Sequence, residues 1–201
     1  MGNRQGSFSS SNFEKIRSET KFTVGEIEDW YGWYKNVVSD SPRQCIDIVE
    51  FKKIFSQIYS SDVEDKYFEH LFRSFDTNGD EEIDFREYMV SLSTTARGSS
   101  TQKLEWAFRV YDINNDGFIS RNEMMEMFSA MQKVICDFIP ESGEECKKVE
   151  DLVDDIISKL DENHDGKVSL KEFVDGSKSN PVIISRLTQI NRRSEYAYRT
   201  F

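Results

Sequence analysis

Three twelve-residue segments of this chain follow one pattern, and this repeat constrains the fold more than any other feature. They span residues 76–87, 112–123 and 161–172, here called loops 2, 3 and 4. Each carries Asp at its first and fifth positions, Asn at its third, a β-branched residue at its eighth and Glu at its twelfth. Residues 39–50, here called loop 1, keep only the Ile at the eighth position and the Glu at the twelfth. Such a repeat indicates one local structure that is built several times along the chain.

Helical periodicity leads into loops 2, 3 and 4. Phe68, Phe72 and Phe75 lie four and three residues apart before loop 2, as one face of an amphipathic helix requires, and similar spacing precedes loops 3 and 4. Thr23 and Glu26 form a capping-box pattern that begins an earlier helix. The sequence therefore predicts an all-α fold of four helix–loop–helix units in two pairs, with short β contacts between paired loops.

The positions of these units divide the chain into four regions. We expect an N-terminal segment over residues 1–22 and a first pair of units over 23–97. A second pair follows over 98–180, and a C-terminal helix and tail over 181–201.

Oxygen atoms at alternate loop positions are the ligands that a calcium ion prefers. Ca²⁺ takes six to eight oxygens, and a twelve-residue EF-hand loop supplies them from its first, third, fifth, seventh, ninth and twelfth positions. The seventh position contributes a backbone carbonyl, and the Glu at the twelfth binds through both oxygens. Mg²⁺ can occupy the same sites when calcium is low. The predicted ligands are Asp76, Asn78, Asp80, Glu82, Asp84 and Glu87 in loop 2, Asp112, Asn114, Asp116, Phe118, Ser120 and Glu123 in loop 3, and Asp161, Asn163, Asp165, Lys167, Ser169 and Glu172 in loop 4.

Loop 2 departs from this pattern at its sixth position. Gly117 and Gly166 occupy that position in loops 3 and 4, where a left-handed turn favours glycine, but loop 2 has Glu81 there and Gly79 two places earlier. A non-glycine residue in the left-handed region costs on the order of 1 kcal/mol, which is about fivefold in affinity. We expect loop 2 to bind calcium with weakened affinity, and a dead site is the alternative.

Loop 1 is predicted not to bind calcium. Ser39, Ser41 and Arg43 replace the acidic and amide residues of the pattern, and Arg43 would place a cation where the ion sits. Pro42 also stiffens the turn. The expected role of loop 1 is to pair with loop 2.

Composition and charge narrow the class of protein. Lys and Arg total 26 against 37 Asp and Glu, so the net charge is −11, which argues against a nucleic-acid-binding protein. Aromatic residues make up 13% of the chain, too many for a disordered acidic protein. The sequence shows no signal-peptide pattern and no apolar run of the roughly 20 residues that span a bilayer. Three widely spaced cysteines suit a reducing compartment. We expect a soluble cytoplasmic protein.

No arrangement of catalytic residues stands out, so the chain is not expected to be an enzyme. His70 and His164 are the only histidines. The spacing places His164 at an outward loop position and His70 on a helix surface. No Cys lies near a His in a spacing typical of a nucleophile or a metal site, and no glycine-rich phosphate loop occurs.

Several stretches together resemble the neuronal calcium sensor family, which includes recoverin, the visinin-like proteins, hippocalcin and neurocalcin. The resemblance covers nearly the whole chain and includes a disabled first loop that contains a proline. Ser41 stands where the family usually has Cys, and Glu81 is a second departure. The stretches that carry the resemblance are residues 1–3, 20–23, 30–31, 72–76, 83–88, 102–108, 165–173 and 176–181.

The resemblance implies a calcium sensor that regulates a membrane-associated target. Family members act on receptor kinases, membrane guanylate cyclases or ion channels. It also implies a myristoyl group on Gly2, which would give peripheral membrane association and a calcium-dependent lipid switch. The usual signature has Ser or Thr at the sixth residue, where this chain has Gly6 followed by Ser7.

A target site can be argued from the residues themselves. EF-hand sensors open on binding calcium and expose an apolar groove for an amphipathic partner helix. The two adjacent Trp-Tyr pairs at 30–34 cannot all face inward on one helix, so some of them should line the groove. The candidate groove residues are Trp30, Tyr31, Trp33, Tyr34, Phe51, Phe55, Phe68, Phe72, Phe85, Tyr88, Met89 and Leu92.

Two other functional classes stay open from sequence. A cytosolic calcium buffer binds the ion but barely opens. A constitutive regulatory subunit, resembling calcineurin B or a channel subunit, would keep its partner without calcium. The sequence also leaves homodimerisation open.

Overall fold

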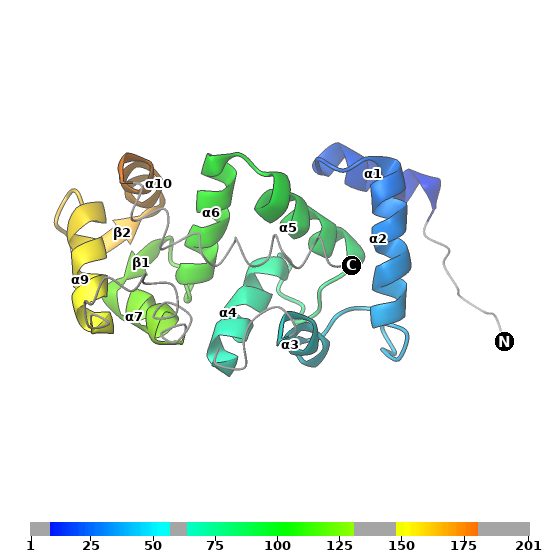
Figure 1. Cartoon of the computed structure of the whole chain (residues 1–201), viewed down its shortest axis with the longest axis horizontal. Coiled ribbons are helices and arrows are strands. Elements are labelled where there is room, and N and C mark those ends of the chain that lie inside the picture. The colour runs from blue at the N-terminus through cyan, green and yellow to red at the C-terminus, as the bar shows by residue number, and fades with distance from the viewer. Residues whose placement is uncertain (1–8, 57–63, 131–147, 181–201) are drawn as a thin grey trace, which may run out of the picture.

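Helices alternate with short loops throughout the described chain. The computed structural model describes residues 9–56, 64–130 and 148–180. Two short strands, β1 (Phe118–Ser120) and β2 (Lys167–Ser169), form a small antiparallel sheet. The helices are α1 (Ser10–Glu19), α2 (Val24–Val37), α3 (Ile48–Ser56), α4 (Asp65–Phe75), α5 (Phe85–Arg97), α6 (Ser100–Tyr111), α7 (Arg121–Ala130), α9 (Val149–Leu160) and α10 (Leu170–Ser179). The predicted all-α fold with short β contacts is confirmed (Figure 1).

The loops pair through the residues at their eighth positions. Ile119 of loop 3 lies opposite Val168 of loop 4 in the β1–β2 ladder. Ile46 of loop 1 and Ile83 of loop 2 form an isolated antiparallel bridge, with N···O distances of 3.1 and 2.9 Å. All four side chains are fully buried. The β-branched residue of the repeat therefore joins two loops and anchors both in the core.

The two pairs of units meet along α4 and α6. These helices lie side by side in the middle of the molecule, with α1 and α2 at one end and α9 and α10 at the other (Figure 1). The α4 helix also packs against α7. The ring of Phe75 on α4 contacts Trp106 on α6 edge to face, with centroids 6.0 Å apart. One continuous apolar core thus connects loops 2 and 3.

The N-terminal segment contains a helix that the sequence did not indicate. On α1, Ile16 is buried and Phe13 packs edge to face on Tyr31 of α2, with ring centroids 5.5 Å apart. Only these two apolar residues lie at helical spacing in α1, and Ser9 before it makes no side-chain capping bond. The helix is therefore held by its packing on α2 and α5 rather than by local sequence.

The capping box predicted at Thr23 is present. The Thr23 hydroxyl accepts a hydrogen bond from the Glu26 N–H at 3.3 Å, and the Glu26 carboxylate accepts one from the Thr23 N–H at 2.8 Å. Glu26 also pairs with Arg97 at the end of α5, at 2.5 Å. The Arg97 bond, with those from Thr23, lowers the pKa of Glu26 to about 2. The start of α2 is thereby fixed to the end of α5.

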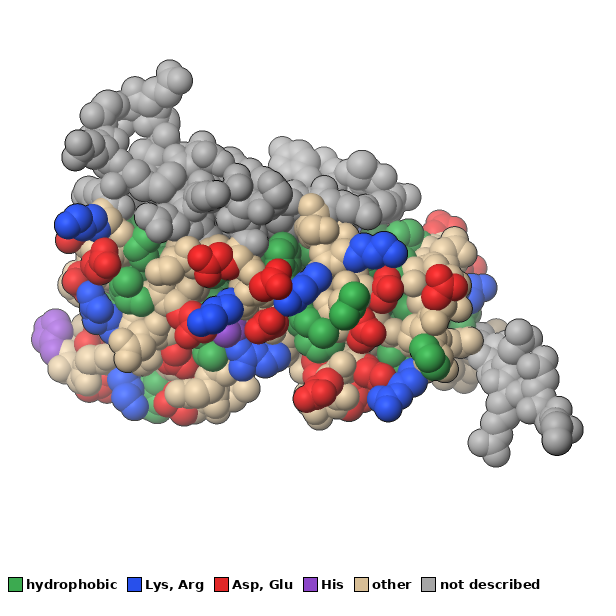
Figure 2. Space-filling view, turned by 90° about the horizontal axis from the view of Figure 1, so that it is seen from below, with side chains coloured by type: hydrophobic (Ala, Val, Ile, Leu, Met, Phe, Trp, Pro, Cys, Tyr) green, Lys and Arg blue, Asp and Glu red, His purple; other side chains and the backbone are tan. Residues whose placement is uncertain are grey.

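The surface of the described residues is mostly polar. Figure 2 shows acidic and basic side chains interspersed over one face, with apolar side chains between them. Val49, Phe118 and Leu170 are the large apolar residues that stand out as exposed in the described part of the chain. Among these residues, no helix combines the length and apolarity needed to span a membrane. Gly2 and the region 181–201 lie outside the described residues.

Candidate metal centres

Loops 2, 3 and 4 share one internal hydrogen-bond network around their first residue. The Asp112 carboxylate accepts bonds from the backbone N–H groups of Asp116 and Gly117 at 3.1 and 3.0 Å. Asp161 accepts the equivalent bonds in loop 4 at 3.2 and 3.0 Å. In loop 2 the Asp76 carboxylate accepts from Gly79 and Glu81, at 2.8 and 2.9 Å. Each loop is therefore wrapped around the carboxylate at its first position.

The third and fifth positions lie close together in each loop. The Asn114 amide donates to the Asp116 carboxylate at 3.2 Å, and the corresponding distances are 3.1 Å in loop 2 and 3.0 Å in loop 4. The Asp116 carboxylate in turn accepts from the N–H of Phe118 at 2.9 Å. Amide and carboxylate oxygens from alternate residues thus gather on the inside of each turn.

The Glu at the twelfth position connects the two ends of each loop. One oxygen of Glu123 accepts from the Asn114 N–H at 3.1 Å, and the other accepts from the Ser120 N–H at 2.8 Å. Glu87 and Glu172 make the same pair of contacts, to the third and ninth positions of loops 2 and 4. The bonds from Ser169 lower the pKa of Glu172. This carboxylate also belongs to the first turn of the exiting helix, so it links the loop to that helix.

These donor atoms fit calcium by type, since carboxylate, amide and carbonyl oxygens are the ligands of a hard cation. In the described part of the chain, no three Asp, Glu, His or Cys side chains are arranged to hold a metal ion. The carboxylates at the first and twelfth positions hold backbone N–H groups instead. Ion binding would therefore require the carboxylates of each loop, including the Glu at the twelfth position, to rearrange.

The sixth position is left-handed in all four loops. Its φ is +64° at Glu81, +85° at Gly117 and +82° at Gly166, and Gln44 of loop 1 has φ of +57°. Glu81 therefore adopts the left-handed conformation for which we expect a free-energy cost.

The fourth position is left-handed as well, although the residue types there did not indicate it. Gly79 occupies it in loop 2 with φ of +74°, whereas loops 3 and 4 have Asn115 and His164 there at +56° and +59°. Each of the three loops thus holds one glycine and one other residue in this region. Loop 2 remains the more strained because Asn and His tolerate the left-handed region better than most residues.

Arg43 of loop 1 does not point to the centre of its own loop. Its side chain is 73% exposed and its Nη1 lies 2.8 Å from a carboxylate oxygen of Glu82 in loop 2. The expectation that it fills the ion position of loop 1 is therefore wrong. The Tyr34 hydroxyl donates to the carbonyl of Ile83 at 2.8 Å, so loop 1 and its entering helix are bonded to loop 2 at several points.

Comparison with known proteins agrees with this geometry. The EF-hand domain pair model matches residues 101–178, and an EF-hand model matches residues 68–92. Recoverin of Homo sapiens is 34% identical over 94% of both chains. Visinin of Gallus gallus is 32% identical over 94% of this chain and 97% of its own length. Guanylyl cyclase-activating protein 2 of Gallus gallus is 34% identical over 84% of both. The chain belongs to the neuronal calcium sensor family.

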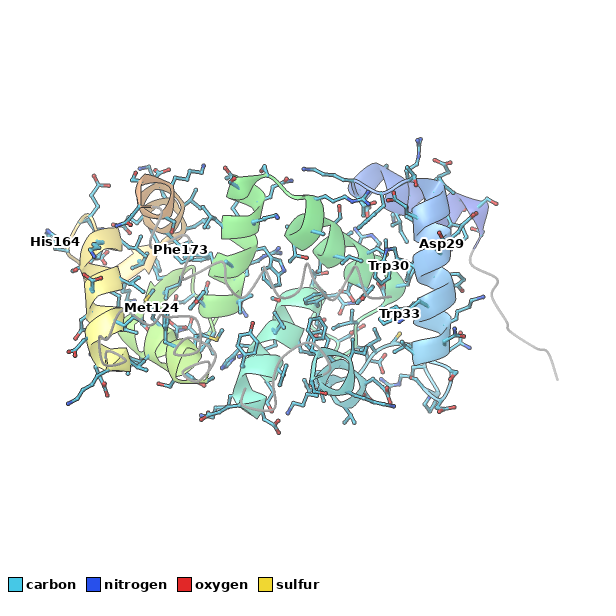
Figure 3. All side chains as sticks on the ribbon, in the orientation of Figure 1. Asp29, Trp30, Trp33, Met124, His164 and Phe173 are labelled. Carbon is cyan, nitrogen blue, oxygen red and sulfur yellow. The ribbon has the colours of Figure 1, made fainter. Side chains whose placement is uncertain are left out.

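Most of the candidate groove residues are buried in the structure. Trp30 and Trp33 lie on the side of α2 that faces α5, and their rings contact Tyr88 with centroids 6.1 and 5.3 Å apart (Figure 3). Tyr31 packs on Phe85, and α1 covers its other side. Trp30, Tyr31 and Trp33 are half-buried. The other candidates are buried: Tyr34, Phe51, Phe55, Phe68, Phe72, Phe85, Tyr88, Met89 and Leu92.

All four aromatic residues at 30, 31, 33 and 34 contact other helices, but only Tyr34 is buried. These contacts arise because α2 packs on α1 as well as on α5, which widens the part of its surface that is covered. Their role as a groove remains a prediction that requires α5 and α2 to separate.

His70 also differs from the expectation of a surface residue. Its side chain is 6% exposed, and its Nε2 lies 3.2 Å from the Glu126 carboxylate on α7. Burial and the neighbouring Arg73 lower the pKa of His70, whereas Glu126 opposes this shift. Local sequence gives no sign of this neighbour, because Glu126 lies 56 residues further along the chain on another helix.

Replacing the Glu at the twelfth position should remove one calcium ion. Glu123→Gln and Glu172→Gln each lose the charge and one strong coordinating oxygen, so calorimetry should count one ion fewer in each variant. Glu50→Gln is the matched control, because it makes the same change at the twelfth position of loop 1 and should leave the count unchanged. An unaltered count in Glu123→Gln would refute loop 3 as a site.

Relieving the strain at Glu81 should tighten loop 2. Glu81→Gly removes a side chain held at positive φ, and we expect about fivefold higher calcium affinity at this loop. Gln44→Gly is the control, since it relieves the same conformation in loop 1 and should leave calcium affinity unchanged. Equal affinities of the Glu81→Gly variant and the parent chain would show that strain does not limit loop 2.

Proposed function

We propose that this chain senses calcium through loops 2, 3 and 4 and converts binding into exposure of an aromatic surface. The observation that carries the proposal is the position of Glu87. It closes loop 2 from the first turn of α5, and the next residue, Tyr88, stacks on Trp33 of α2. When the ion takes the Glu87 carboxylate, the start of α5 moves with it. Tyr88 then leaves Trp30 and Trp33, and the groove between α2 and α5 opens.

The exposed surface would bind an amphipathic helix of a membrane-associated target. Among the relatives, guanylyl cyclase-activating protein 2 and the guanylyl cyclase inhibitory protein of Lithobates pipiens name a guanylyl cyclase as what they act on. The second is 37% identical over 75% of this chain and 73% of its own length. A guanylyl cyclase is therefore the first target class to test, with a receptor kinase or a channel as alternatives. One of these relatives is named as an activator and the other as an inhibitor, so whether this chain would activate or inhibit its target stays open.

We further propose that a myristoyl group on Gly2 places the protein at the cytoplasmic face of a membrane. One myristoyl group gives only marginal membrane binding, so exposing or burying that group can switch the association with the membrane. A buffer would bind calcium without this switch, and a constitutive subunit would keep its target in chelator. These outcomes distinguish a sensor from a buffer and from a constitutive subunit.

Tryptophan emission should report the opening of the groove. In a Trp106→Phe background, Trp30 and Trp33 are the remaining tryptophans. A helical peptide with one basic and one apolar face should shift their emission with calcium and leave it unchanged in chelator. Glu87→Gln should abolish this response, whereas Glu172→Gln, the same change at the far end of the molecule, should retain it. A response in chelator would contradict a calcium-opened groove.

Membrane binding should depend on both the lipid and calcium. We expect the N-myristoylated protein to sediment with anionic liposomes in calcium and to remain in the supernatant in chelator. Gly2→Ala, which cannot be acylated, is the control and should stay in the supernatant in both conditions. Equal sedimentation with and without calcium would replace the switch with a constitutive anchor.

A further inference from the structure

Most arginines in the described part of the chain pair with a carboxylate, and two do not. The five pairs are Arg17–Glu14, Arg43–Glu82, Arg86–Glu19, Arg97–Glu26 and Arg121–Asp154, at distances between 2.5 and 2.8 Å. Arg73 and Arg109 make no such pair within residues 9–56, 64–130 and 148–180, although the chain carries an excess of eleven negative charges.

Both of these arginines line the same cavity, of about 350 Å³. It lies where α4 and α6 end and loops 2 and 3 begin, and Ser74, Thr77 and Asn115 also line it. Each arginine stands three residues before the first Asp of its loop. At the joint between the two pairs of units, two exposed arginines therefore border one open cavity.

Most of the donor capacity of these guanidinium groups is unused. Arg73 donates to the carbonyl of Ile113 at 3.0 Å and contacts the ring of His70, which leaves several of its five N–H donors available. Arg109 makes no hydrogen bond to any described residue. Arg109 is an exposed residue, yet desolvation lowers its pKa, and Glu105 opposes this shift. In Arg86, Arg97 and Arg121, by contrast, the carboxylate partner raises the pKa.

The carboxylates at the cavity edge do not serve as partners for these arginines. Asp76 and Asp112 line it, but their oxygens accept N–H groups of their own loops, as described above. The position of the arginines at helix C-termini explains why a positive charge is favoured there. It does not supply an acceptor for their N–H groups.

We propose that this cavity binds an oxyanion, a carboxylate or phosphate-like group, between Arg73 and Arg109. The planar fork of a guanidinium donates two parallel hydrogen bonds to such a group. The cavity has the size of a small-ligand site, and the amide of Asn115, which also lines it, carries further N–H donors.

The site is coupled to calcium through Asp76 and Asp112. Both are predicted ligands at the first position of their loops, so calcium in loops 2 and 3 would neutralise the two carboxylates that line the cavity. Anion affinity should therefore rise when calcium is bound. By thermodynamic linkage the anion should raise calcium affinity by the same factor, on the order of fivefold, which is at the low end of allosteric coupling.

Titration of the full chain with sodium sulfate and with sodium acetate tests this site. Two-dimensional NMR at constant ionic strength would follow the backbone signals of Ile113 and Asn115, with calcium and with chelator. We expect saturable shifts that are tighter in calcium. A response to sulfate alone assigns a tetrahedral anion, and a response to acetate, alone or with sulfate, assigns a carboxylate site. No response to either anion in both calcium states would overturn the proposal.

Two variants locate the effect. Arg109→Gln should lose the saturable shifts, and it should also lose the anion-induced gain in calcium affinity. Arg121→Gln is the matched control, because it removes the same charge beside loop 3 but from a residue outside the cavity, bonded to Asp154; it should retain both effects. If each variant binds the same number of calcium ions as the parent chain, its loops are intact. Equal anion binding by Arg109→Gln and the parent chain would refute the site and leave the sensor function untested by this experiment.

Discussion

The carboxylate at the twelfth position of loops 2, 3 and 4 is the interaction on which the rest of the structure depends. In loop 3 it holds the N–H groups of Asn114 and Ser120, so it fixes both ends of the turn. It also belongs to the first turn of the exiting helix, whose apolar residues lie in the core. A group shared by a binding loop and a core helix cannot change partners without moving that helix. Ion binding and helix position are therefore one equilibrium in this fold.

Pairing of the loops gives loop 1 a structural role that does not depend on calcium. Ile46 is fully buried and bonded to Ile83 through both backbone groups, so its removal would expose the partner residue of loop 2. Arg43 adds a positive charge beside Glu82 of the most acidic loop. Loop 1 thus contributes both a packing surface and a counter-charge to loop 2, in which the left-handed Glu81 is already strained.

Local sequence predicted the loops because their chemistry is encoded at fixed spacing. In loops 3 and 4 the third position is bonded to the fifth, the first and twelfth positions accept backbone N–H groups of their own loop, and the cap at Thr23 is present. What local sequence could not show depends on distant residues. The α1 helix is held by packing on α2, His70 is buried against Glu126, and Arg43 reaches across to another loop. The left-handed fourth position was missed because Asn and His adopt it without a glycine to mark it.

Whether the protein acts as a sensor or as a buffer depends on the free-energy cost of separating α2 from α5. Their contact includes Trp30 and Trp33 on Tyr88, and Tyr34 on Phe85. Aromatic pairs are worth about 0.5–1.5 kcal/mol each beyond their buried area, so opening costs several kcal/mol in water. Micromolar calcium binding supplies about 8 kcal/mol, but only the difference in affinity between open and closed states can move α5. A target helix that covers the exposed rings restores their burial. On the proposed function, the groove would open most completely when calcium and target are present together, as a sensor requires and a buffer does not.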